Sequence, residues 1–109
     1  MVLTAPYVPE TIVVHLGYPT AAAQNVTVSF LDYIKNVASS EIYPTWPEAA
    51  LRANIYAQIS FTLNRIYTEW YRSQGYDFDI TNTTQFDHAF VYERSIFDTV
   101  SQIVDELFT

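Results

Sequence analysis

One carboxylic acid stands out in the sequence because of its neighbours. Glu41 is followed by Ile42 and Tyr43, and it precedes Pro44 and Trp46. A carboxyl group flanked by bulky apolar and aromatic side chains keeps its proton to higher pH than one in water, and a general acid working near neutral pH needs this property. The pattern makes Glu41 the best candidate for proton transfer. The alternative left open is an acid that caps the next turn or is simply exposed.

The other titratable residues give weaker signals. His15 lies in a β-branched run without a second His, Asp or Glu in register, which is typical of an ordinary strand residue. Asp77 and Asp79 resemble the start of a calcium loop, but the glycine and the distal glutamate of such a loop are missing. Two solvated acids in a turn are therefore expected there. With two glycines and no cysteine, the chain has no phosphate-binding glycine loop and no thiolate metal site. We expect no metal and no cofactor.

The segments on both sides of Glu41 are predicted to be helical. Residues 29–32 begin with a serine that can cap a helix, and apolar residues then recur at helical spacing up to residues 39–40. Residues 45–48 have the pattern of a capping box with an early proline. A long helix over at least residues 48–70 is predicted, because an apolar stripe follows without Gly or Pro. The stripe consists of Leu51, Ile55, Ile59, Leu63, Ile66 and Trp70.

Strands and another helix complete the predicted fold. Residues 11–16 are β-branched and residues 26–30 alternate, with turn-forming residues between them, which predicts a hairpin. Residues 75–91 are expected to be extended chain with little regular structure. Residues 96–107 follow a 3.6-residue period, which predicts a C-terminal helix. The predicted class is α+β: a small antiparallel β-hairpin packed on a long central helix, with a short preceding helix and a C-terminal amphipathic helix, in one domain over residues 1–109.

Composition limits the partners of the chain. Twelve acidic residues against five basic ones give a net charge of −7, so a nucleic acid partner is not expected. Lys35 is the single lysine, which also argues against attraction to anionic lipid. No run approaches the roughly 18 to 20 apolar residues of a membrane span, and residues 1–4 lack the pattern of a signal peptide. No membrane insertion is expected. Half of the residues are hydrophobic, which is enough for a folded core.

The segment from Leu31 to Asn54 resembles the signature of the stage II sporulation protein D family. In that family a short helix that begins with leucine leads into serine or alanine, glutamate, an apolar residue and proline, as at residues 40–44 here. Residues 46–51 match the Trp-Pro-x-x-Ala-Leu pattern that opens a long helix in the family. Residues 76–84 resemble the segment after that helix. The resemblance is closest to a clostridial branch of secreted or surface proteins associated with peptidoglycan binding.

The resemblance implies an enzyme of the bacterial cell wall. In that family the glutamate at the place of Glu41 is the catalytic acid of a lytic transglycosylase. Carried over, Glu41 would protonate the leaving oxygen between N-acetylmuramic acid and N-acetylglucosamine, and then accept the proton of the muramoyl 6-hydroxyl group as a 1,6-anhydro ring closes. Tyr43 and Trp46 are candidates for stacking on sugars, with core packing as their alternative role. The implied partner is the peptidoglycan glycan strand, and the implied location is extracellular, at the cell wall or cell surface.

Differences from the family keep a second class of function open. The long helix of the family carries Ala-Arg-Thr-Tyr where this chain has residues Gln58 to Phe61, and His88 precedes Ala89 where relatives show glutamine before an aromatic residue. The family's domain also continues beyond the part matched here. The alternative is therefore a non-catalytic structural or interaction module that forms homo-oligomers. The apolar residues expected at such an interface are Tyr56, Tyr67, Phe97 and Phe108.

Overall fold

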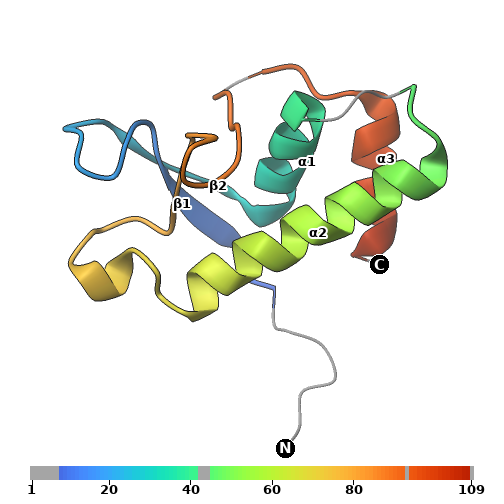
Figure 1. Ribbon diagram of the computed structural model, residues 1–109. Coiled ribbons are helices and arrows are strands. Elements are labelled where there is room, and N and C mark those ends of the chain that lie inside the picture. The colour runs from blue at the N-terminus through green and yellow to red at the C-terminus, as the bar shows by residue number, and fades with distance from the viewer. Residues whose placement is uncertain (1–7, 42–44, 93, 109) are drawn as a thin grey trace, which may run out of the picture.

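A small sheet and several helices make up the computed structural model, which describes residues 8–41, 45–92 and 94–108 (Figure 1). The elements in chain order are β1 (Thr11–His15), β2 (Asn25–Ser29), α1 (Phe30–Glu41), α2 (Glu48–Tyr67), the 3-10 helix η1 (Arg72–Gln74), β3 (Ile80–Thr81) and α3 (Asp98–Leu107). The predicted α+β class is confirmed. No helix in the described part of the chain is long and apolar enough to cross a membrane.

The sheet has the order β2-β1-β3. Strands β1 and β2 are antiparallel, as the sequence predicted, with His15 opposite Asn25 at the turn end. The third strand was not predicted: β3 pairs in parallel with β1 inside the segment expected to lack regular structure. Asp79 continues this pairing, because its N–H donates to the Val13 carbonyl and its carboxylate oxygen accepts from the Val13 N–H, both at 2.9 Å. The side chain of Asp79 therefore takes the place of a backbone acceptor.

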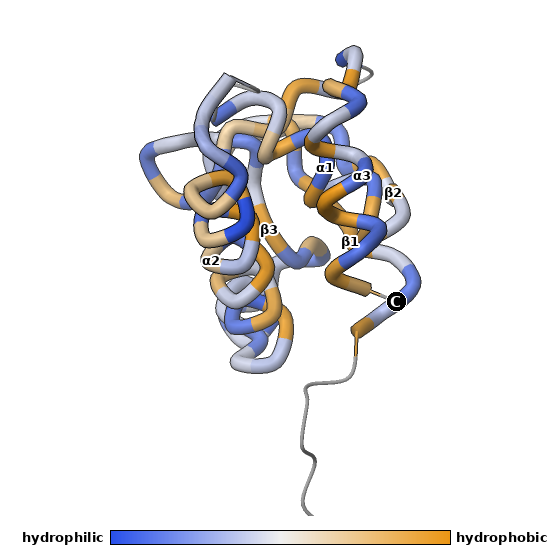
Figure 2. The backbone as a smooth tube through the Cα atoms, turned by 90° about the vertical axis from the view of Figure 1, so that its right-hand side faces the viewer, coloured by the Kyte–Doolittle hydropathy of each residue, from blue (hydrophilic) through white to orange (hydrophobic). Residues whose placement is uncertain are grey.

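The short helix α1 is the most buried of the helices in the described chain. Seven of its twelve residues are buried, compared with six of twenty in α2. It packs against α2, α3, β1 and β2, and it begins as predicted, with the Ser29 hydroxyl accepting from the Asp32 N–H at 3.0 Å. Helix α3 covers α1 with Val100, Ile103 and Val104. Figure 2 shows the alternation of hydrophobic and hydrophilic residues along α3 that produces this one-sided burial.

The predicted stripe of α2 faces the core, but both ends of the helix differ from the prediction. Leu51, Ile55, Ile59 and Leu63 are buried, and Ile66 is partly buried. At the start, Pro47 is the N-cap residue and no side chain caps the helix, so the predicted capping box does not form. At the other end, α2 stops at Tyr67 and does not continue to residue 70.

The early end of α2 has a clear backbone cause. Glu69 has a φ of 52°, which is left-handed backbone. The Trp70 N–H donates to the Arg65 carbonyl and the Glu69 N–H donates to the Ile66 carbonyl, each at 3.1 Å. These two bonds form a Schellman motif, which satisfies the last carbonyls and turns the chain away from the helix axis. Glycine is the usual residue at the left-handed position, so glutamate there gives no sequence signal for a helix end.

Candidate functional site

Glu41 is the last residue of α1, and its exposed side chain is held by two other parts of the chain. One carboxylate oxygen, Oε1, accepts a hydrogen bond from the Ala89 backbone N–H at 3.1 Å. The other, Oε2, accepts from the Gln58 side-chain amide of α2 at 3.2 Å. Glu41 is therefore the point where α1, α2 and the segment after β3 meet. Two donors from separate segments fix the orientation of the carboxyl group while it stays open to solvent.

Buried polar atoms without partners lie around this carboxyl group. The Tyr33 hydroxyl, Gln58 Oε1 and His88 Nδ1 are buried and lack a hydrogen-bond partner in the described structure. Gln58 bonds to Glu41 through its amide nitrogen, and His88 directly precedes Ala89. Because buried polar atoms are rarely left unpaired, such a group marks a place that can accept water or a ligand.

Burial also changes the protonation of two side chains near Glu41. Desolvation lowers the pKa of His88, although the carboxylates of Glu41 and Asp87 act in the opposite direction. Desolvation raises the pKa of Tyr33 well above its ordinary value, and Asp87 and Glu41 add to this effect. At neutral pH His88 is therefore an uncharged imidazole and Tyr33 an uncharged phenol. Glu41 is the member of this set that faces solvent.

Asp87 anchors the segment that brings Ala89 to Glu41. Its fully buried side chain accepts hydrogen bonds from Arg65 Nε at 2.9 Å and from the Tyr71 hydroxyl at 2.6 Å. It also accepts from the Thr81 N–H at 3.0 Å and from the Thr81 hydroxyl at 2.7 Å. Burial and the bond to Asp87 raise the pKa of Tyr71. A buried carboxylate with this many donors holds its loop in one position.

A comparison with known protein families shows which family the chain belongs to. The model of the family described as SpoIID, stage II sporulation protein, matches residues 19–106, a stretch that includes Glu41, Gln58 and His88. The chain belongs to the SpoIID family. Membership indicates a sporulation-related function at the cell wall, and the match does not separate the clostridial branch from others. No curated protein and no solved structure matches the chain significantly.

Of the two aromatic side chains predicted to stack on sugars, one lies in the described part of the chain. Trp46 lies in the turn before α2 and is 37% exposed, so its ring is not enclosed in the core. Tyr43 lies outside the described residues. The stacking role predicted for both side chains stays a prediction.

Sequence reasoning missed the two groups that hold Glu41. The family arginine was aligned with Ile59, which is buried, whereas the neighbouring Gln58 contacts the acid. A signal for Gln58 was present, since it lies three residues after Ile55 and four before Thr62 on one buried face of α2. A polar residue within an apolar helix face points to a specific partner. The Ala89 N–H gave no signal, because any residue carries this donor.

Among residues 8–41, 45–92 and 94–108, no group of three or more His, Cys, Asp or Glu side chains is close enough to hold a metal ion. Asp77 and Asp79, which resemble the start of a calcium loop, have structural partners instead. Asp77 accepts from the Asn25 amide at 3.0 Å, and Asp79 accepts from Arg72 Nε at 2.8 Å.

Proposed function

We propose that this SpoIID-family chain acts on the glycan strands of peptidoglycan, with Glu41 as the acid and then the base of a lytic transglycosylase reaction. The observation that supports this proposal is the state of Glu41: it is exposed, it is oriented by Gln58 and by the Ala89 N–H, and both Gln58 and the neighbouring His88 have a buried polar atom without a partner in the described structure. A solvent-facing carboxyl group held in one orientation suits proton transfer to a bound substrate.

The reaction needs one carboxyl group and no water molecule. Glu41 in its acid form gives its proton to the glycosidic oxygen, and the bond from C1 of N-acetylmuramic acid to that oxygen breaks. The 6-hydroxyl oxygen of the same muramic acid residue then bonds to C1. Its proton passes to the Glu41 carboxylate, which restores the acid. Since Glu41 serves in both steps, the pair of carboxylates that a hydrolase positions around its substrate is not required.

Gln58 and Ala89 act in this proposal as positioning groups. Each donates to a different oxygen of Glu41, so neither reacts itself. The substrate also sets the location: peptidoglycan lies outside the cytoplasmic membrane, and the proposed location is the cell wall or cell surface.

The first prediction is that Glu41→Gln abolishes the reaction and keeps the fold. Purified protein is incubated with peptidoglycan stripped of other polymers, and mass spectrometry measures released 1,6-anhydro products. The amide keeps the shape of Glu41 but has no proton to give, so product should disappear while the melting temperature stays nearly unchanged. Glu10→Gln removes an exposed acid outside the site and serves as the control. Wild-type protein that releases no anhydro product, or an active Glu41→Gln variant, would refute the proposal.

A second candidate is a structural module of the same family that assembles with copies of itself. The observation that favours it is the exposure of large apolar side chains: 65% for Tyr56, 51% for Tyr67 and 38% for Phe97. Phe108 contributes less, because it is partly buried with its ring edge-on to Phe30 at 6.0 Å. Exposed aromatic residues spread over α2 and the start of α3 provide surface for association.

A further inference from the structure

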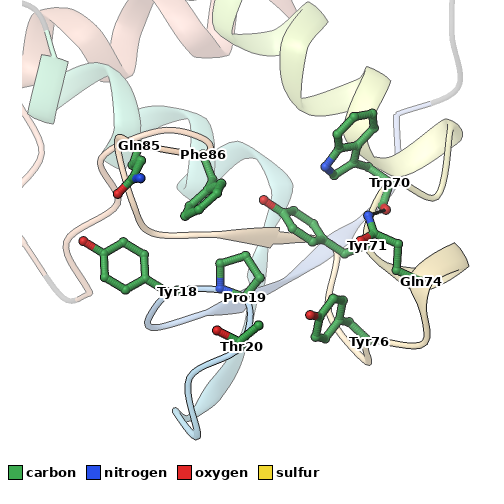
Figure 3. A pocket seen from close by; sticks show the side chains of 9 residues that line it. All are labelled: Tyr18, Pro19, Thr20, Trp70, Tyr71, Gln74, Tyr76, Gln85 and Phe86. Atoms are coloured by element: carbon green, nitrogen blue, oxygen red, sulfur yellow. Dashed lines mark hydrogen bonds between the residues drawn. The ribbon is translucent and has the colours of Figure 1, made fainter.

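A pocket of about 650 Å³ lies beyond the C-terminal end of α2, apart from Glu41 (Figure 3). Its volume is in the range of about 300 to 1,000 Å³ that is common for small-molecule sites. Aromatic rings form most of its wall: Tyr18, Trp70, Tyr71, Tyr76 and Phe86. Figure 3 shows Tyr18 and Phe86 on one side of the hollow and Trp70, Tyr71 and Tyr76 on the other. The two sides come from different parts of the chain.

Hydrogen bonds hold both walls of this aromatic pocket in place. The Schellman motif at Glu69 turns the chain so that Trp70 leaves the helix, and the Tyr71 hydroxyl is fixed on Asp87. On the opposite side, the loop that carries Tyr18 is tied to β1 by a 2.9 Å hydrogen bond between His15 Nε2 and the Ala21 carbonyl. The pocket is therefore formed before a ligand arrives, which lowers the entropic cost of binding.

The chemistry of the aromatic pocket suits a neutral, hydroxyl-rich ligand. None of the described residues that line it carries a charged side chain, and the Arg65 guanidinium group over the Trp70 ring is already paired with Asp87, so the wall offers phosphates and carboxylates no free counter-charge. Thr20, Gln74 and Gln85 supply hydroxyl and amide groups that both donate and accept hydrogen bonds. Sugar hydroxyl groups also donate and accept, and the C–H faces of a pyranose ring pack on aromatic faces. A sugar therefore matches both the rings and the polar groups.

A row of contacting side chains lies between the aromatic pocket and the Glu41 site. Phe61 lies 4.7 Å from the ring of His88, and the Arg65 guanidinium group lies 4.7 Å from Phe61 and 4.4 Å from Trp70. Gln58, the partner of Glu41, is two turns before Arg65 on α2, which corresponds to about 10 Å along the helix axis. These contacts lead along α2 from the neighbourhood of Gln58 to Trp70 in the wall of the pocket.

We propose that the aromatic pocket is a second saccharide subsite, which holds a neutral sugar of a glycan strand while Glu41 faces another part of the same strand. The inference rests on the proposed function in one respect, because it takes the ligand to be a glycan. It goes beyond the proposed function because it assigns glycan binding to residues that do not take part in the reaction. Loss of the pocket should weaken binding of an uncharged sugar oligomer without removing the acid.

The test uses the tetrasaccharide of β-1,4-linked N-acetylglucosamine, a neutral oligomer without muramic acid, and isothermal titration calorimetry on the whole chain. Wild-type protein should bind it. Trp70→Ala and Tyr18→Ala, which change opposite walls, should each weaken binding about tenfold, because aromatic anchors carry a large share of binding energy. Tyr56→Ala removes another exposed aromatic ring, which lies on α2 outside the pocket, and should leave affinity unchanged. Melting curves check that each variant is folded.

Several outcomes would overturn the subsite. The first is that folded wild-type protein does not bind the sugar, and the second is that neither Trp70→Ala nor Tyr18→Ala weakens binding. The third is that the same residues bind a proline-rich peptide and not the sugar, since aromatic grooves also bind such peptides. The subsite and the proposed reaction fail separately. If the sugar binds through Trp70 but no anhydro products are released, the subsite is supported and the proposed reaction is refuted. If release of anhydro products depends on Glu41 while Trp70→Ala and Tyr18→Ala bind the sugar as well as the wild type, only the subsite is refuted.

Discussion

His88 combines a buried ring with charged neighbours. Its ring packs at a tilt against Phe61, and Glu41, Asp87 and Arg65 all act on it electrostatically. Because desolvation outweighs the two carboxylates, the pKa of the folded ring lies below its ordinary value. The unfolded chain therefore takes up this proton first as the pH falls. Stability due to the neutral ring is complete above about pH 6.5, the ordinary value for histidine, and is lost as the pH falls toward the lowered pKa.

The second prediction follows from this linkage. The free energy of unfolding of the wild type should fall between about pH 7 and about pH 5.5, by at most about 1.4 kcal/mol per pH unit for one proton. His88→Gln cannot take up the proton and should have a flatter dependence over the same range. Urea denaturation at several pH values measures both slopes. Equal slopes in the two proteins would contradict a lowered pKa at His88.

The Glu41 site also illustrates what residue patterns can predict. Glu41 was found from its own neighbours in the sequence, because its flanking apolar and aromatic residues and the family signature are local features. Its partners Gln58 and Ala89 lie 17 and 48 residues away, and the role of Asp87 depends on four donors from three places in the chain. These contacts arise only after α1, α2 and the segment after β3 have packed together.

At the scale of elements, an apolar stripe packs α2 against the core, and the third prediction concerns that stripe. Leu63 is 5% exposed and belongs to the core cluster. Leu63→Ala should lower the free energy of unfolding by about 2 to 5 kcal/mol, because it removes apolar contact and leaves a cavity. Tyr56→Ala, on the exposed side of the same helix, should change it by less than about 0.5 kcal/mol. Chemical denaturation of the two variants compares these effects, and a loss near zero for Leu63→Ala would exclude the residue from the core.

The end of α2 provides the fourth prediction. Glu69 adopts left-handed backbone, which costs a residue with a Cβ roughly 1 to 2 kcal/mol and glycine much less. Glu69→Gly should therefore stabilise the fold by about 0.5 to 1 kcal/mol, the remainder being lost to the greater freedom of glycine in the unfolded chain. Thermal unfolding measures the change. A lower melting temperature for Glu69→Gly would show that the glutamate side chain stabilises this turn by more than its backbone costs.

Elements with a repeating pattern were predictable, and elements without one were not. The hairpin, α1, α2 and α3 follow from alternation or from the 3.6-residue period. Strand β3 has two residues, too few for any alternation, and it exists because β1 offers an edge to pair with. The end of α2 was misplaced for a different reason: its left-handed residue is Glu69, where a glycine would have signalled the turn.

At the scale of the whole molecule, charge and apolar surface oppose each other, and the fifth prediction depends on their balance. The chain carries a net charge of −7, while Tyr56, Tyr67 and Phe97 expose large parts of their rings. If these rings pair between copies, association should strengthen as salt shortens the screening length from about 30 Å to about 10 Å. Light scattering across this salt range measures the mass. A monomer at every salt concentration would end the self-assembly alternative.

The parallel pairing of β3 with β1 has a consequence for how the chain folds during synthesis. Val13 and Asp79 are 66 residues apart, so one edge of β1 stays without a neighbour until the segment that contains Asp79 and β3 has been made. The hairpin and α1 are adjacent in sequence and can form early. The pairing of β3 with β1 forms later, because it must overcome the entropic cost of closing a long loop. Open strand edges are the usual starting points of aggregation. A nascent chain that ends before Ile80 is therefore the form of this protein most in need of a chaperone.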